Sequence, residues 1–166
     1  MSSTREEYGN RLKLKKEATM KVFADRLMNV LENHRKEIAQ QWCTAVRQNP
    51  RTPSFNNISE EDVLNRAVSF YKNLNKMYFS EKPYTEVQKY FSEYAEVSYK
   101  LNIPLHETLY ALIMMRRHMW LYADFQAPFL SAMDHRQAVE TLNKTIRMFD
   151  HGIYIITQRY GELGKG

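Results

Sequence analysis

Apolar residues recur every three or four positions along most of this chain, which is the spacing of an amphipathic α-helix. Residues 4–48 contain no proline, and a bend near Asn33 would divide them into two helices. Pro50 and Pro53 then predict a loop over 49–54, because proline disfavours helix on both of its sides. The chain is therefore expected to begin with two helices and a loop.

Helix-start signals mark the elements after this loop. Ser59, followed by three acids ending at Asp62, resembles a capping box with Asp in place of Glu, and the acids suit the positive end of the helix dipole. We expect this helix to run to about Tyr78. Pro83 suits the first turn of the next helix, because the N–H that proline lacks has no helical partner there.

Two longer helices are expected in the rest of the chain. Pro104 precedes a helix predicted over 105–125, whose centre, 109–115, is apolar on all sides, as is typical of a helix buried on most of its surface. Asp134 is the predicted N-cap of the last helix, over 135–161. No strand pattern occurs, and five Gly and five Pro are too few for the turns of an all-β domain.

A length of 166 residues and this pattern predict a single all-α domain of about six helices, packed as a bundle or in a globin-like way, with a long C-terminal helix. We place the helical domain at 27–163, after a basic helical extension at 1–26 and before a tail at 164–166. The residues expected to be mostly buried against one another are Trp42, Phe70, Phe91, Leu109, Leu112, Trp120 and Phe149.

The last predicted helix carries a strict heptad, in which apolar residues alternate steps of three and four. An ordinary packed helix drifts toward a period of 3.6 residues instead. Two interpretations stay open: a helix in a groove of its own core, or an interface with a second copy of the chain. Gly152 would permit close approach of another backbone there. The heptad residues are Val139, Leu142, Ile146, Phe149, Ile153, Ile156 and Tyr160.

The formal net charge of +5 is concentrated near the N-terminus, where Arg11 and the lysines between 13 and 21 face one acid, Glu17. A solvated helix face is the interpretation we favour, and nucleic acid or an anionic membrane surface is the alternative. No aromatic residues alternate with these lysines, as they do in proteins that bind single strands. Nucleic acid is therefore not the expected partner.

Three features of the sequence predict where the protein is located. No apolar run approaches the roughly 18 residues that a membrane-spanning helix needs, and the N-terminus lacks the apolar core of a signal peptide. Cys43 is the only cysteine, which excludes an intrachain disulfide and favours a cytoplasmic protein. We interpret Cys43 as a small apolar residue beside Trp42.

Catalytic and metal-binding motifs are almost absent. The chain contains neither a Gly-rich nucleotide loop nor a G-x-S-x-G nor a C-x-x-C pattern. His106 and Glu107 begin like the zinc motif H-E-x-x-H, but Tyr110 stands where the second histidine belongs, so no metal site is expected. Glu93 and Glu96 lie one turn apart and are interpreted as solvated. The sequence therefore predicts a protein that is not an enzyme.

The helix over 105–125 carries three weak candidates for a ligand site: Arg116, His118 and Trp120. For Arg116 we favour a salt bridge to an acid of a neighbouring helix, or stacking on Trp120, since a buried Arg must be paired or stacked. Recognition of an anionic ligand is the alternative. His118 would ligate haem in a globin-like pocket, although a hydrogen-bonded boundary histidine is the favoured interpretation. No cofactor is expected, with haem as the alternative.

A further pattern extends over about 27–161 and consists of Ile38, Trp42, Ser59–Asp62, Asn102–Glu107, Ala111, Leu112, Arg116, Trp120, Arg159 and Tyr160. It resembles the N-terminal sensor domain of the RsbRD type, from RsbT co-antagonist proteins of bacterial stress complexes. The resemblance implies a partly globin-like all-α fold without obligatory haem, homodimers, and a non-catalytic role in receiving signals or binding partners. In that family such domains precede an output domain, so we expect this chain either to act alone or to be one part of a longer protein.

Together these observations predict a non-enzymatic bacterial signalling or sensor domain of the cytoplasm. It would dimerise and transmit a state through its C-terminal helix to a signalling partner or an output module. A globin-like sensor of haem or gas is the alternative function.

Overall fold

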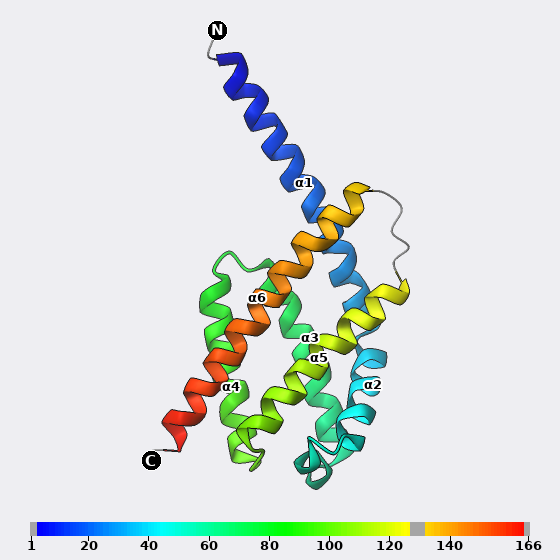
Figure 1. Ribbon diagram of the computed structural model, residues 1–166, viewed down its shortest axis with the longest axis vertical. Coiled ribbons are helices and arrows are strands. Elements are labelled where there is room, and N and C mark those ends of the chain that lie inside the picture. The colour runs from blue at the N-terminus through cyan, green and yellow to red at the C-terminus, as the bar shows by residue number, and fades with distance from the viewer. Residues whose placement is uncertain (1–2, 127–131, 165–166) are drawn as a thin grey trace.

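The computed structural model describes residues 3–126 and 132–164, except for the side chains of 3–6, 15–23, 123–126, 132–135 and 137–138. Over these residues the chain consists of helices joined by short turns and contains no strand, so the predicted all-α fold with a long last helix is confirmed. Figure 1 shows the arrangement. The helices are α1 (Ser3–Asn33), α2 (Arg35–Gln48), the short 3-10 helix η1 (Pro53–Asn57), α3 (Glu60–Phe79), α4 (Pro83–Lys100), α5 (Leu105–Gln126) and α6 (Ala132–Leu163).

The first break in the helical chain lies at His34, which confirms the bend expected next to Asn33. From Ala24 onward α1 packs into the molecule, whereas residues 7–14 are exposed and the first half of the helix projects away from the other helices (Figure 1). The basic side chains described there, Arg11 and Lys13, therefore lie on a solvated helix face. Because α1 is continuous across position 26, the division into extension and domain stays a prediction.

The start of α3 is capped as predicted. The backbone N–H of Asp62 donates to the Ser59 hydroxyl oxygen at 3.1 Å, and that hydroxyl donates to the Asp62 carboxylate at 2.6 Å. A cap of this kind stabilises a helix by about 1 kcal/mol. Pro83 opens α4, also as predicted.

The loop before α3 differs from the prediction, because η1 begins inside it at Pro53. Glu107 of α5 explains the added turn. Its buried carboxylate accepts hydrogen bonds from the Ser54 backbone N–H at 2.8 Å and from the Ser54 hydroxyl at 2.9 Å. A carboxylate at this position satisfies a donor that a helix start leaves without a helical partner.

The turn from α4 to α5 depends on Asn102, which has a positive φ of 55°. The N–H of Asn102 donates to the carbonyl of Tyr99, and that of Ile103 donates to the carbonyl of Ser98. These two bonds form a Schellman motif, in which the left-handed residue is usually Gly or Asn. Ile103 is thereby buried beneath the end of α4.

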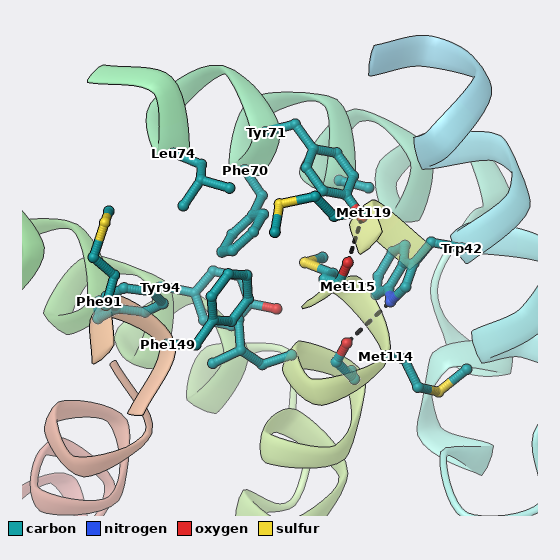
Figure 2. Close-up of a cluster of buried hydrophobic side chains, with 14 of the residues drawn as sticks. Trp42, Phe70, Tyr71, Leu74, Phe91, Tyr94, Met114, Met115, Met119 and Phe149 are labelled. Atoms are coloured by element: carbon teal, nitrogen blue, oxygen red, sulfur yellow. Dashed lines mark hydrogen bonds between the residues drawn. The ribbon is translucent and has the colours of Figure 1, made fainter. Parts of the chain in front are cut away.

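All six α-helices contribute buried side chains to the core, and Figure 2 shows its centre, where residues of α2, α3, α4, α5 and α6 meet. Two of its polar aromatic atoms are satisfied by α5: the indole N–H of Trp42 donates to the Ala111 carbonyl at 3.0 Å, and the Tyr71 hydroxyl donates to the Met115 carbonyl at 2.9 Å. Of the seven predicted core residues, five are buried, whereas Leu109 and Trp120 are half-buried at the edge of α5.

Cys43 is fully buried beside Trp42, as expected of a small apolar residue. Burial, together with the nearby charge of Glu60, raises the pKa of the Cys43 thiol above its usual value. A buried thiol with a raised pKa is a poor nucleophile, because the thiolate is the reactive form.

The last helix begins at Ala132, two residues before Asp134, so the prediction that Asp134 is the N-cap is wrong. The residues that precede this start, 127–131, lie outside the described part of the chain. α6 ends at Leu163, two residues beyond the predicted limit. At Gly152 the Phe91 ring of α4 lies directly against the backbone of α6.

Candidate functional site

The heptad residues of α6 divide into two groups. Phe149, Ile156 and Tyr160 are buried in the core of the chain itself. Tyr160 is anchored further by its hydroxyl, which donates to the Ile103 carbonyl at 2.9 Å and lies 2.8 Å from the Thr108 hydroxyl. For this group, the interpretation of a helix in a groove of its own core accounts for the apolar side chains.

The second group is only partly covered. Leu142, Ile146 and Ile153 are half-buried, and Val139 is 53% exposed. This edge of α6 faces α5, because Phe149 and Asp150 both meet Arg116 of α5, and residues one turn away lie on the same side of a helix.

The facing edge of α5 is apolar as well. Leu109, Ile113 and Trp120 are spaced at −7, −3 and +4 from Arg116 and therefore share its side of the helix. Ile113 is 38% exposed, and the other two are half-buried. We call this surface the α5–α6 strip; it comprises Leu109, Ile113, Trp120, Val139, Leu142, Ile146 and Ile153.

Arg116 of α5 forms an ion pair with Asp150 of α6 across the strip. Its guanidinium lies 3.5 Å from the Asp150 carboxylate and 6.0 Å from the centre of the Phe149 ring. The expected pair with an acid of a neighbouring helix is therefore confirmed, while the ring under the guanidinium belongs to Phe149 and not to Trp120. Because Asp150 is 61% exposed, the pair stabilises the fold by less than about 1 kcal/mol.

His118 and Trp120, the other two candidate ligand residues on α5, do not lie together in one site. The indole nitrogen of Trp120 is buried without a hydrogen-bond partner among the described residues. His118 lies two positions from both Arg116 and Trp120 and so on another face of the helix. Its Nδ1 donates to the Met114 carbonyl at 2.8 Å, which confirms the hydrogen-bonded boundary histidine.

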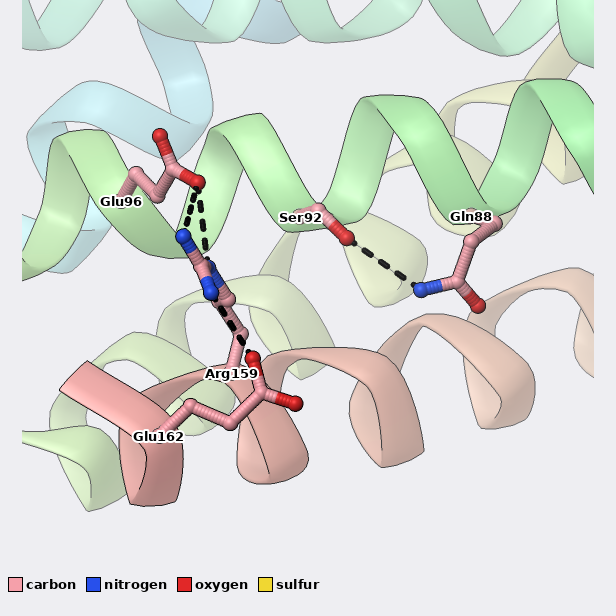
Figure 3. Close-up of polar contacts among 5 residues, drawn as sticks. All are labelled: Gln88, Ser92, Glu96, Arg159 and Glu162. Carbon is pink, nitrogen blue, oxygen red and sulfur yellow. Dashed lines mark hydrogen bonds and ion pairs between the residues drawn. The ribbon is translucent and has the colours of Figure 1, made fainter. Parts of the chain in front are cut away.

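Figure 3 shows that Glu96, one of the acids interpreted as solvated, is paired. Arg159 of α6 donates to one carboxylate oxygen of Glu96 from Nε at 3.0 Å and from Nη2 at 2.7 Å. It also donates to Glu162 at 2.8 Å. That part of the prediction is wrong, because a single sequence does not show which helix lies beside α4. His106, in contrast, is exposed, and Glu107 serves the η1 turn.

A groove that the sequence reasoning missed lies on the other edge of α6. It has a volume of about 860 Å³ and is bounded by the end of α3, the start of α4 and the middle of α6, with Ala24 of α1 at its side. Aromatic rings form one wall, and α6 contributes Lys144, Arg147 and His151. No local sequence motif predicts this groove, because its walls come from segments that are more than fifty positions apart in the sequence.

Within the described part of the chain, no group of three or more His, Cys, Asp or Glu side chains is arranged to hold a metal ion. The helices described also include none with the length and apolar character needed to cross a membrane.

Comparisons with known proteins add no relative: neither a family model, nor a curated protein, nor a solved structure matches this chain. The resemblance to RsbRD-type sensor domains, with the globin-like packing and the haem alternative that accompany it, therefore stays a prediction.

Proposed function

We propose that this chain is a non-enzymatic signalling domain of the RsbRD sensor type, located in the cytoplasm. It forms a homodimer through the α5–α6 strip and passes a conformational state along α6 to a signalling partner or output module. The observation that carries the proposal is the second group of heptad residues. Val139, Leu142, Ile146 and Ile153 keep the strict heptad spacing, although the core of the chain leaves them partly exposed.

The composition of the strip supports a second copy as its partner. A surface that pairs with itself about a two-fold axis must be self-complementary, and apolar side chains together with charges of both signs meet that condition. The strip supplies Ile113 and Val139 as exposed apolar residues, and the exposed Arg117 and Asp150 lie beside it. Arg117 of one copy is thus able to meet an acid of the other.

The contacts of α6 support its role in transmission. This helix packs on α4, α1 and α5, so a change in its position alters three interfaces at once. Packed helices shift between discrete arrangements instead of deforming continuously, and a helix at a two-fold interface can therefore report a small change in its surroundings.

Sedimentation velocity at tens of micromolar tests the dimer, with the double variant Val139→Glu/Ile146→Glu. The parent chain is expected to sediment as a dimer and the variant as a monomer, because the change places four carboxylates in one interface. Both sites are at least partly exposed, so the helical circular dichroism should be retained. Ile156 is unsuitable for this test, since it is fully buried in the chain's own core.

Tyr154→Glu is the matched control, because Tyr154 is 62% exposed on α6 and lies outside the strip. This variant should remain dimeric. A monomeric parent chain would contradict the proposal, and so would a double variant that stays dimeric.

A further inference from the structure

The groove beside α6 is lined by cations on one side. Lys144, Arg147 and His151 follow one another at spacings of three and four residues and therefore lie on the same face of the helix. Glu140 is the acid in the lining. Lys144 and Arg147 outweigh Glu140 by one positive charge, which suits a ligand that carries a single negative charge.

Lys144 is held in place by the end of α3. Its ammonium donates to the Tyr78 carbonyl at 2.8 Å and lies 4.1 Å from the centre of the Tyr78 ring. Partial burial lowers the pKa of Lys144 below its usual value. An ammonium has three donors, so one bond to a carbonyl leaves two for a ligand, already positioned against the groove wall.

The opposite wall is aromatic and open. Tyr84 is 75% exposed, and its ring meets that of His151 edge to face, with 5.8 Å between the ring centres. Phe79 is also exposed and meets Tyr78 edge to face at 5.1 Å. Met148 and Val87 form the buried floor between the two walls. Exposed aromatic residues grouped over an apolar floor are typical of a binding surface.

We propose that this groove binds a small organic anion with an aromatic or aliphatic body. The body lies on Met148 and Val87 beside Tyr84, and the anionic group takes hydrogen bonds from Lys144 and Arg147. The volume of the groove lies within the range of about 300–1,000 Å³ found for small-molecule sites.

This inference goes beyond the proposed function and does not depend on dimerisation. The groove and the α5–α6 strip lie on different edges of α6. Lys144 of the groove and Ile146 of the strip are two positions apart, and residues at that spacing do not share a face of a helix. An occupied groove therefore contacts the same helix that carries the strip, which gives a ligand direct access to the element proposed to transmit the state.

Two fluorescent probes of matched shape test the charge requirement. Anilinonaphthalene sulfonate carries one sulfonate, and N-phenylnaphthylamine has the same ring system without a charge. We expect the parent chain to bind the sulfonate at one site per chain, at least about tenfold more tightly than the neutral probe, which corresponds to about 1.4 kcal/mol.

Arg147→Met and Tyr84→Ala test the location, since both residues are exposed and neither change should alter the melting temperature. Arg147→Met should weaken binding of the sulfonate about tenfold and leave the neutral probe unaffected, whereas Tyr84→Ala should weaken both. Lys36→Met is the matched control, because it removes an exposed cation from α2, outside both the groove and the strip.

The proposal is overturned if the parent chain does not bind the sulfonate, if both probes bind equally, or if Arg147→Met binds like the parent. It is also overturned if the strip variant Val139→Glu/Ile146→Glu abolishes binding, since the probe then occupies the strip. A monomeric parent chain that still binds the sulfonate in the groove would reject the proposed dimer and retain this inference.

Discussion

At Gly152, α6 has no side chain, and the Phe91 ring of α4 occupies the space where one would begin. A Cβ built on Gly152 would lie 2.6–2.8 Å from three carbon atoms of that ring. Because Phe91 is buried among other aromatic rings, it has little room to move aside. The close approach anticipated from the glycine therefore serves the chain's own packing.

Gly152→Ala should lower the free energy of unfolding by about 1–3 kcal/mol, the usual range for an overfilled core. Helix propensity alone predicts the opposite, a gain of about 1 kcal/mol. Gly161→Ala is the control, since nothing lies within 4 Å of a Cβ at that position of α6. Urea denaturation of both variants checks the prediction, and a stabilised Gly152→Ala would show that the two helices are farther apart.

Asn102 supplies the second residue-scale prediction. With φ at 55°, Asn102→Val should destabilise the fold by about 1–2 kcal/mol, because a branched side chain is strained in the left-handed region. Asn102→Gly should preserve or slightly raise the stability. Thermal melts of the two variants compare them directly, and equal stability of the Val and Gly variants would contradict the Schellman geometry.

At the scale of the helix, α5 separates buried from exposed positions between neighbouring residues. Leu112 is fully buried, whereas Ile113, the next residue, is 38% exposed. Leu112→Ala is expected to lower the free energy of unfolding by about 2–5 kcal/mol. Ile113→Ala should lower the free energy of unfolding by less than about 1 kcal/mol. Similar losses at both positions would contradict the orientation of α5, in which Leu112 faces the core and Ile113 faces solvent.

Helix boundaries were the most predictable part of the structure, because the residues that set them act locally. Pro83 and the Ser59 cap each satisfy or remove a backbone donor within one turn, so their effect does not depend on the rest of the fold. The prediction of Asp134 as an N-cap failed because an acid near a helix start is equally suitable within the first turn of the helix.

It was less predictable which apolar residues of α6 face the core of the chain. Periods of 3.5 and 3.6 residues differ by only about 20° per heptad, so a heptad does not reveal how a helix divides its apolar residues between its own core and another surface. Tyr160 and Val139 show the result, since both keep the heptad spacing, yet one is buried and the other exposed. The groove was not predictable at all, because Tyr84 and Lys144 meet only after α4 has packed on α6.

At the scale of the whole molecule, α6 lies between two surfaces of different character. The α5–α6 strip is apolar with charges of both signs, and the groove is aromatic with an excess of positive charge. If both proposals hold, binding of the sulfonate probe should change the dimer dissociation constant, because both surfaces are formed by α6. Dimerisation would then change the affinity for the probe by the same factor, since equilibrium coupling is reciprocal. Sedimentation equilibrium with and without the probe measures this coupling, and an unchanged constant would mean that the two surfaces act independently.

The unbroken course of α1 has a mechanical consequence. The C-terminal part of α1 packs on α6. The roughly twenty residues of α1 before Ala24 add about 30 Å to the length of the helix, at 1.5 Å per residue. A tilt of about 10° at the packed end, hardly visible inside the core, would carry the far tip through about 5 Å. A label near the N-terminus would therefore report a small tilt of α1 against α6 as a displacement of several ångströms, which distance measurements can follow.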